Sequence, residues 1–541
     1  PWGEEAFADA VEQTKLVFAS IGYQACPWSQ RMADETFENA AVAALINENC
    51  IAIKVDRFAR PDIDLAFRAY ARAHGLSVGW PLNVWLTPTG NPLNVDGYLP
   101  PDSSGANSGF RKIGTHILSQ WEKHPQYLVD QSRRDIEDLR NRIARKPVEE
   151  IEQSSAGETI DSFYTQASAN FDPVGGGFDM EIKFPRYETL NALAELARSL
   201  PAENFRRKQA TKMVTRTIGG MLSGAIVDPL DGGVFRYALD PKWRTPQFEK
   251  LLVDQARFAL AAIAAYEISG DESFAAAARR VLEFADAALA APDGCYYTSL
   301  ADDTAALRGD PRGSSYYLWG TAELGSLLDP AEVDAFNAAF GIRAGGNITA
   351  RGQLGGLPSN ANIPYAAIPA ARAPAAGTVL EKAVEKVRKA RASRQQPARD
   401  ETVIAGWNGM MVSALARVGD ALDDPQLIAR ATALAGAIEG SLFDKDELAR
   451  GRVGDRRFGS AYSEDYIYLA RAYLDLHRAA DSQATLDKAS ALQARANERF
   501  FDSGRGIYHL TPTRAITELP LELWVINDGD LPSPSGIAAL N

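Results

Sequence analysis

Paired amphipathic segments place the strongest restriction on the fold of this chain. From residue 187 onward, apolar residues recur at helical spacing, and Gly, Pro or Asp separates each segment from the next. We expect five helical hairpins, at 187–200 with 204–223, 245–269 with 272–290, 316–328 with 330–340, 402–420 with 425–442, and 462–479 with 482–500. Consecutive antiparallel hairpins bury one another's apolar faces, which predicts an α/α toroid.

The first 130 residues have a different pattern, in which helical spacing alternates with short apolar runs. After an N-terminal helix, the runs at 15–23 and 50–56 predict buried strands, and the segment 28–48 between them has helical spacing. A further helix is expected at 61–75, and two strand-like runs then meet at the turn "TPTGNP". This order of elements is typical of a thioredoxin-like α/β domain, and the parallel strand pair fits the right-handed crossover rule.

The two patterns together predict a multidomain protein. We expect a thioredoxin-like α/β domain at residues 1–130, a charged helical connector at 131–154, and an all-α toroid of helical hairpins at 155–541. The Ala-, Gly- and Pro-rich stretch 341–378 is the one long irregular insertion expected in the toroid. Loops of that length are usually either functional or disordered.

Composition and charge restrict the class of function. The chain has 541 residues, of which 46% are hydrophobic and 23% charged, as in globular proteins with a sizeable core. Its 57 Lys and Arg residues against 70 Asp and Glu give a net charge of −13, which disfavours nucleic acid as a partner. No apolar run approaches the roughly 18 residues that span a bilayer. We therefore expect a soluble protein without a membrane span.

The cysteine content bears on the compartment. Cys26, Cys50 and Cys295 are too few for a disulfide framework, which favours the reducing cytoplasm and leaves the periplasm open. The chain begins at Pro1 without Met or a signal-like apolar segment, so we expect the natural N-terminus to lie upstream.

Motif-like stretches occur along nearly the whole chain. In the first domain they are "PWGEEAF" (1–7), "FASIGYQACPWSQRM" (18–32), "IKVDRFARPDID" (53–64) and "GWPLNVWLTPTGNPL" (79–93). In the helical region they are "GGGFDMEIKFPR" (175–186), the glycine-rich stretch 219–256, "DETVIAGWNGMMVSALA" (400–416), "SEDYIYLARAYLDL" (463–476) and "PSPSGIAALN" (532–541). In this order they resemble the spermatogenesis-associated protein 20 family, whose bacterial and animal members fuse a thioredoxin-like domain to an (α/α)6 barrel.

The resemblance implies both domains of the predicted fold. Family members normally continue well beyond the last of these motifs, so we expect this chain to lack about the sixth hairpin. The family's barrel is similar to those of sugar epimerases and six-hairpin glycosidases, which implies carbohydrate chemistry by analogy of fold. A fold by itself does not determine a function.

Cys26 is the candidate redox residue of the first domain. It stands at the start of an expected helix, where the helix dipole and free amides stabilise a thiolate, and Trp28 would shape the turn. By the resemblance, Trp80-Pro81 is the cis-proline that faces the cysteine, and a second cysteine with flanking histidines is missing from this loop. A lone thiol would remain trapped as a mixed disulfide until another thiol released it. A structural or vestigial thiol is the alternative interpretation.

The mouth of the barrel is the second candidate site. Its loops and helix starts carry carboxylates for acid–base chemistry, aromatic rings for stacking on sugars, and arginines for polar contacts. The catalytic candidates are Asp231, Glu249 and Glu464, together with Cys26 in the first domain. The ligand-binding candidates are Trp28, Phe235, Arg236, Tyr237, Trp243, Asp254, Trp407, Asn408, Asp465 and Tyr466. We predict no metal site and no cofactor.

Departures from the family pattern weigh against catalysis. The family usually carries histidines where this chain has Phe235 and Gln247, and imidazole is the commonest proton shuttle near neutral pH. The leading hypothesis is a divergent family member with a degenerate active site, which binds a carbohydrate-like ligand or a protein partner with weak or no catalysis. The alternatives are a carbohydrate-processing enzyme of epimerase or glycosidase type that uses barrel carboxylates, and a single-thiol redox protein. A purely structural role of the same residues also stays open.

Overall fold

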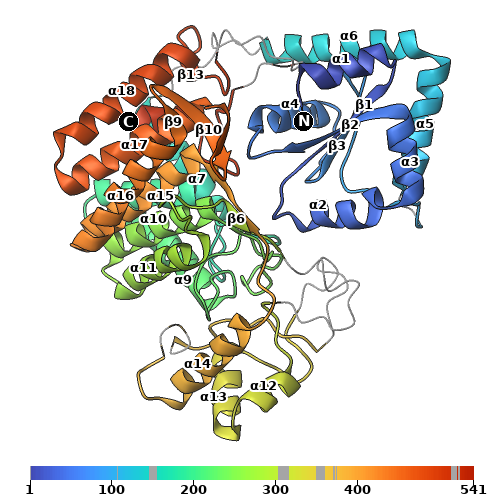
Figure 1. The fold of residues 1–541 in the computed structure, drawn as a ribbon. Coiled ribbons are helices and arrows are strands. Elements are labelled where there is room, and N and C mark those ends of the chain that lie inside the picture. The colour runs from blue at the N-terminus through green and yellow to red at the C-terminus, as the bar shows by residue number, and fades with distance from the viewer. Residues whose placement is uncertain are drawn as a thin grey trace.

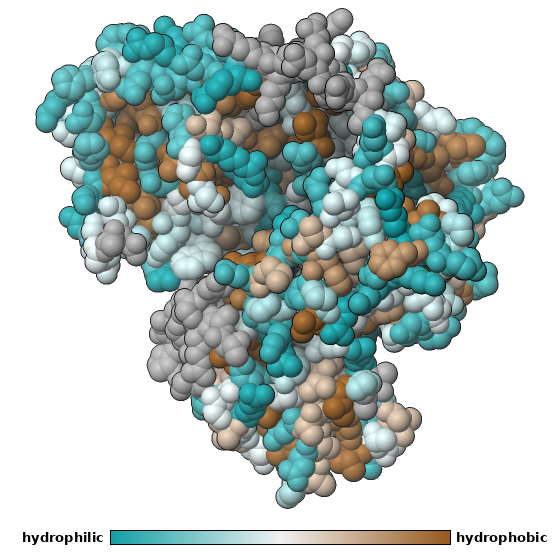
Figure 2. Space-filling view, turned by 180° about the vertical axis from the view of Figure 1, so that it is seen from behind, coloured by the Kyte–Doolittle hydropathy of each residue, from teal (hydrophilic) through white to brown (hydrophobic). Residues whose placement is uncertain are grey.

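The structure is a computed structural model (Figure 1). It describes residues 2–105, 108–144, 155–302, 316–348, 360–369, 372, 374–512, 521 and 524–541. The N-terminal domain lies on one side of the molecule, and a larger helical region lies on the other. A small group of helices, α12 to α14, projects from the helical region, and the space-filling view from behind shows the same projection (Figure 2).

The N-terminal domain has the predicted thioredoxin-like topology. Its elements are α1 (Glu4–Glu12), β1 (Leu16–Gly22), α2 (Pro27–Arg31), the π-helical turn η1 (Met32–Phe37), α3 (Ala40–Asn49), β2 (Cys50–Asp56), α4 (Pro61–Ala73), β3 (Leu82–Leu86), β4 (Pro92–Asp96), α5 (Phe110–Lys123) and α6 (Pro125–Ala144). The sheet order is β2-β1-β3-β4, in which β1 pairs parallel with β2 and antiparallel with β3. The Trp80-Pro81 peptide bond is cis, as expected.

The central strand β1 explains how this domain holds together. Six of its seven residues are buried, and successive side chains point to opposite faces of the sheet. Val17, Ala19 and Ile21 pack in the cluster that contains residues of α1 and α4. Leu16 and Phe18 belong to the opposite cluster, with residues of α3 and α5. The continuous apolar run therefore forms the central strand of a mixed sheet that is covered on both faces.

Helices dominate the rest of the chain. The elements are α7 (Ala156–Asn170), α8 (Tyr187–Ser199), α9 (Phe205–Ser223), β5 (Lys250–Leu251), α10 (Leu252–Ser269), α11 (Glu272–Leu289), β6 (Ser299–Leu300), α12 (Thr321–Leu327), α13 (Pro330–Phe340), α14 (Val379–Ala392), β7 (Arg399–Asp400), β8 (Thr402–Ile404), α15 (Ala405–Ala421), α16 (Pro425–Leu442), β9 (Phe443–Asp444), β10 (Glu447–Val453), β11 (Arg456–Ser460), α17 (Ser463–Ala480), α18 (Gln483–Phe500), β12 (Phe501–Asp502), β13 (Ile507–Tyr508) and α19 (Pro534–Leu540).

Four of the five predicted hairpins are confirmed: α8 with α9, α10 with α11, α15 with α16, and α17 with α18. Their first helices pack side by side in the order α8, α10, α15, α17, and each second helix packs on its own first helix. Because α10 and α15 have neighbours on most sides, 13 of the 18 residues of α10 and 14 of the 17 residues of α15 are buried. The hairpins therefore form an arc with an inner and an outer layer of helices.

The prediction that a hairpin at 316–328 with 330–340 belongs to this arc is wrong. Helix α12 has only seven residues, too few to cross a layer formed by helices of 13 to 19 residues. Together with α13 and α14 it forms a separate unit around its own core, which includes Leu324, Phe336 and Val387. Of the predicted irregular insertion 341–378, residues 349–359, 370, 371 and 373 lie outside the described part of the chain. The same is true of residues 145–154 of the predicted connector.

Short strands bring one end of the arc toward the N-terminal domain. Strands β5, β6 and β7 form a small sheet directly before α10, and β8 pairs with β10 directly before α15. The first residues of α10, α15 and α17 consequently lie near the loops of the thioredoxin-like domain. Within the described residues, no helix is both long enough and apolar enough to cross a bilayer.

Candidate functional site

The thioredoxin-like domain covers the end of the helical arc at which α15 and α17 begin. Phe58, from the loop after β2, packs on Trp407 of α15 with ring centroids 4.5 Å apart. Arg450 of β10 donates two hydrogen bonds to the Phe58 carbonyl oxygen, at 2.7 and 2.9 Å. The Tyr462 hydroxyl donates to the Asp62 carboxylate at 2.7 Å. These buried contacts fix the two domains against each other.

A cleft of about 590 Å³ opens beside this contact. Residues of α4, the loop before α8, the start of α10 and the loop 524–532 form its walls. Its charged lining residues are Arg57, Asp64, Arg68, Arg72, Arg186, Glu188, Arg236, Asp254, Arg257, Glu464, Asp528 and Asp530, and its aromatic ones are Phe184, Tyr187 and Trp524. The cleft therefore offers many hydrogen-bonding groups and a few apolar faces, as ligand sites do.

Asp254 is the carboxyl group of this cleft with the most unusual environment. It lies in the first turn of α10 and is 5% exposed, and its Oδ2 atom has no hydrogen-bond partner among the described residues. Burial raises its pKa from 3.8 to about 7, although Arg257, 3.8 Å away, and Arg236 oppose this. Asp254 can thus hold or release a proton near neutral pH, as general acids and bases do.

Glu464 is the second carboxyl group at the base of the cleft. It lies in the first turn of α17 and accepts a hydrogen bond from Arg450 at 2.7 Å. Burial raises its pKa, and the Arg450 guanidinium partly opposes this shift. A second cavity of about 40 Å³ is lined by Glu464, Asp254 and Trp407. Arg236 lines this cavity as well, so the structure brings four of the predicted site residues together.

Asp530 enters the cleft from the loop after β13. Its carboxylate lies 2.8 Å from Arg57, 3.1 Å from Arg236 and 4.0 Å from Arg68. Burial would raise the pKa of Asp530, but the three arginines together hold it well below its usual value. The Arg257 guanidinium donates to the backbone carbonyl oxygen of Asp530 at 2.7 Å. This loop was not among the sequence candidates.

Glu249 lies beneath the thioredoxin-like domain and does not line the cleft. It is 1% exposed and accepts hydrogen bonds from the Tyr23 hydroxyl at 3.1 Å and from Arg236 at 3.2 Å. Burial raises its pKa, and Arg236 and Tyr23 oppose this. Its position gives Glu249 a role in joining the two domains, since Tyr23 comes from one and Arg236 from the other.

The Cys26 thiol precedes α2 as expected, but it is buried in the same domain contact. Its Sγ atom lies 3.6 Å from the Trp80 carbonyl oxygen, and only 4% of the residue is exposed. Burial raises the thiol pKa, and nearby Glu249 raises it further, against a hydrogen bond from Ser29. The lowered pKa expected from the helix start is therefore wrong for this thiol, because desolvation and a carboxylate outweigh the helix dipole.

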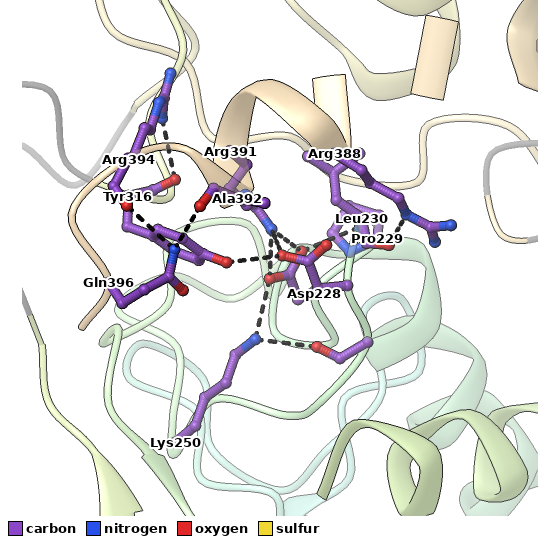
Figure 3. A network of polar contacts seen from close by, with 12 residues as sticks. Asp228, Pro229, Leu230, Lys250, Tyr316, Arg388, Arg391, Ala392, Arg394 and Gln396 are labelled. Carbon is purple, nitrogen blue, oxygen red and sulfur yellow. Dashed lines mark hydrogen bonds and ion pairs between the residues drawn. The ribbon is translucent and has the colours of Figure 1, made fainter. Parts of the chain in front are cut away.

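Asp231 belongs to a different cluster, next to the α12–α14 unit. It accepts a hydrogen bond from Arg391 at 2.9 Å, and Arg391 also binds Asp228 (Figure 3). Lys250 donates to Asp228 at 3.0 Å, and all three residues of this Asp228–Lys250–Arg391 network are fully buried. Since Arg391 belongs to α14, the network holds the glycine-rich turn 228–233 against this helix. Asp231 thus lies in a structural contact outside the cleft.

The other predicted ligand-binding residues divide between the cleft and the core. Arg236 lines the cleft, and Tyr237 stacks on the cleft residue Phe184 with ring centroids 4.7 Å apart. Away from the cleft, three of these aromatic residues pack on other rings: Trp28 on Tyr98, Phe235 on Phe248 and Tyr317, and Tyr466 on Phe500. Trp243 donates a hydrogen bond to the Gly175 carbonyl oxygen, and the Asn408 side chain hydrogen-bonds with the Tyr296 backbone. Asp465 accepts from Arg450 and from two backbone amides.

Arginines of the thioredoxin-like domain are the functional candidates that sequence reasoning missed. Arg57 and Arg68 stack on the Trp80 ring, with their guanidinium carbons 3.8 and 4.7 Å from its centroid. Arg57 belongs to the motif "IKVDRFARPDID", which in the sequence indicates the family and not a site. In the described part of the chain, no three His, Cys, Asp or Glu side chains are grouped to hold a metal ion.

The fold and this cleft define a two-domain protein, in which a thioredoxin-like domain covers one end of an arc of helical hairpins. The family model Thioredox_DsbH, described as "Protein of unknown function, DUF255", matches residues 1–140. Human spermatogenesis-associated protein 20 is 31% identical over 578 aligned residues, which cover 100% of this chain and 72% of the human protein. The mouse protein of the same name is also 31% identical, with the same coverage. The chain belongs to the spermatogenesis-associated protein 20 family.

Two solved structures each match part of this chain. A sugar epimerase from a ruminal bacterium is 12% identical with a TM-score of 0.32, covering 71% of this chain and 97% of its own. The unsaturated glucuronyl hydrolase from Bacillus sp. GL1 is 11% identical with a TM-score of 0.36, covering 72% and 75%.

Proposed function

We propose that the cleft between the two domains binds a small carbohydrate-like ligand, with weak or no turnover. The observation that carries this proposal is the buried Asp254 carboxyl, whose Oδ2 atom lacks a partner and which lines an open cleft of about 590 Å³. Unpaired buried polar atoms are unfavourable, so a ligand hydroxyl that pairs with this oxygen would gain binding free energy. In this proposal the hairpins belong to an (α/α)6 toroid, and the cleft is its mouth.

The lining suits a polyhydroxylated molecule. Arginine and carboxylate side chains present several donors and acceptors at fixed positions, and each sugar hydroxyl can use both kinds. Phe184 and Trp524 add apolar faces on which the C–H surface of a sugar ring can pack. A cleft of this volume lies within the range of about 300–1,000 Å³ that is typical of small-molecule sites.

The contacts made by the catalytic candidates favour binding over turnover. Glu249 and Asp231 are held in ion pairs outside the cleft, so neither is free to transfer a proton to a ligand there. Phe235 packs among aromatic rings and Gln247 donates to Asp302, so neither replaces the histidines expected from the family. The histidines' role as a proton shuttle is left without a substitute at these two positions.

The enzymatic alternative rests on Asp254 and Glu464. Both carboxyl groups line the cleft, and the pKa of Asp254, about 7, suits proton transfer at neutral pH. Sugar hydrolysis uses a pair of carboxyl groups, one that donates a proton to the leaving group and one that acts as a base or a nucleophile. Turnover of any sugar that is abolished by Asp254→Asn would favour this alternative over simple binding.

A sugar-binding panel tests the proposal. Calorimetric titration of the full chain with neutral and acidic mono- and disaccharides should find at least one ligand, and Asp254→Asn should weaken its binding about tenfold. Asp161→Asn is the matched control, because it removes the same charge from the exposed face of α7. Absence of binding by every sugar, or equal binding by Asp254→Asn and the parent protein, would contradict the proposal.

A further inference from the structure

Three guanidinium groups surround a single carboxylate at one end of the cleft. Arg57 and Arg236 make direct ion pairs with Asp530, at 2.8 and 3.1 Å, and Arg68 lies 4.0 Å away. Arg57 and Arg236 come from opposite domains, so the cluster exists only where the domains meet. Asp530 itself belongs to the cleft wall, and its side chain is 32% exposed.

The arginines are held in place by groups other than Asp530. Trp80 packs against the guanidinium groups of Arg57 and Arg68, and Asp64 accepts from Arg57 at 3.3 Å. Arg236 is fixed by Glu249 and by the Tyr23 hydroxyl. The donors would therefore keep their positions if Asp530 moved away, and a preorganised site loses less entropy when it binds.

One donor of this cluster is unused. The Nη1 atom of Arg57 is buried and has no hydrogen-bond partner in the described part of the chain. Close to the cluster, the Asp254 Oδ2 atom also lacks a partner, and Asp254 lines the same cleft. A free donor and a free acceptor that belong to residues of the same cleft suit a ligand that carries an anionic group and a hydroxyl.

We propose that Arg57, Arg68 and Arg236 bind an anionic group of the ligand, a carboxylate or a phosphate, and that Asp530 occupies this place in the unliganded protein. This inference rests on the proposed function and narrows its substrate class to acidic or phosphorylated sugars. The ligand anion carries charge of the same sign as the Asp530 carboxylate that it replaces. The guanidinium groups therefore have a negatively charged partner both before and after the exchange. Guanidinium groups suit both anions, because their paired N–H donors match two oxygens.

Two contacts hold the loop around Asp530 in place, so the exchange can be confined to the Asp530 side chain. Arg257 holds the Asp530 carbonyl oxygen, and the Ser533 amide donates to Asp528 at 2.9 Å. These contacts keep the loop on the cleft wall while the Asp530 side chain turns away. The exchange therefore needs a side-chain rotation and no displacement of a helix.

The test measures binding of D-glucuronate, D-glucose 6-phosphate, D-glucose and inorganic phosphate to the full chain by calorimetry. We expect at least one of the two acidic sugars to bind about tenfold more tightly than glucose, and its affinity to fall with added salt. Asp530→Asn removes the internal competitor and should raise the affinity for the acidic sugars and for phosphate about tenfold. Glucuronate and glucose 6-phosphate distinguish carboxylate from phosphate as the preferred group.

Two variants control for unrelated effects. Asp528→Asn removes a charge from the same loop but keeps the oxygen that accepts from Ser533, so it should change anion affinity much less than Asp530→Asn. Arg68→Gln should weaken the binding of acidic sugars by a factor several times larger than the factor by which it weakens glucose binding, because it removes one of the three positive charges; Arg68 is 28% exposed and carries only longer ion pairs, so the fold should tolerate the change.

The outcomes separate the two proposals. Equal binding of glucose and the acidic sugars, with no gain in Asp530→Asn, would overturn the anion site and leave the proposed sugar binding intact. If no sugar binds but Asp530→Asn gains affinity for inorganic phosphate, the anion site stands and the proposed function fails. No gain for any anion in Asp530→Asn overturns the inference in every case.

Discussion

Replacing Asp254 by Asn should change how the stability of the protein depends on pH. Asp254 is 5% exposed at the start of α10, and its pKa is raised from 3.8 to about 7 by burial. Asn has nearly the same shape and cannot ionise, so it removes the burial of a charge while it keeps the packing. The variant thus isolates the free energy of ionising this one group.

The sign and size of this change in the free energy of unfolding follow from the pKa values of Asp254 in the folded and unfolded protein. The folded protein holds the Asp254 proton up to about pH 7, whereas the unfolded chain releases it near pH 3.8. The stability that Asp254 contributes in its neutral form is therefore fully present below about pH 4 and is lost as the pH rises through about 7. A difference of about three pH units corresponds to about 4 kcal/mol. Asp254→Asn should therefore match the parent protein at low pH and exceed its stability above pH 7.

Differential scanning calorimetry across this pH range measures the effect. The difference in melting temperature between Asp254→Asn and the parent protein should grow from about pH 4 to about pH 7 and then level off. The surface variant Asp161→Asn, treated in the same way, should show no such trend, because its carboxylate is 56% exposed. A melting-temperature difference that stays constant across the range would refute the reasoning that Asp254 is neutral in the folded protein.

Two further predictions concern the contact between the domains. The Cys26 thiol should resist alkylation by iodoacetamide at neutral pH in the folded protein and react only after unfolding, because burial and Glu249 raise its pKa; rapid labelling, read by mass spectrometry, would instead support the single-thiol redox hypothesis. Arg450→Met should lower the unfolding free energy by about 3–5 kcal/mol, because it leaves two buried carboxylates without their counterion. A melting temperature within a degree of the parent's would contradict this role of Arg450.

Much of the fold could be predicted from local pattern. The apolar run of β1 and the helical spacing of the long hairpins are local properties, because buried strands and amphipathic helices each have a characteristic spacing of apolar residues in the sequence. The α12–α13 pair has the same helical spacing as the other hairpins, so periodicity alone could not exclude it from the arc. What separates it is its tertiary contact with α14, which lies some forty residues further along the chain.

The site was harder to predict because it is shared between domains. Asp254 and Glu464 were found because they are carboxylates at helix starts, and Arg236 because it is an arginine in a glycine-rich loop motif. Arg57 and Asp530 were missed because each gains its role only from the other, across 473 positions of sequence. The burial of Glu249 under the thioredoxin-like domain also has no signal in its own segment.

A crystal structure of the protein with its tightest-binding sugar tests the central claim most directly. We predict that the sugar lies in the cleft between the domains, with a hydroxyl group within hydrogen-bond distance of the Asp254 carboxyl. A sugar bound at another surface, with Asp254 still lacking a partner, would contradict the account.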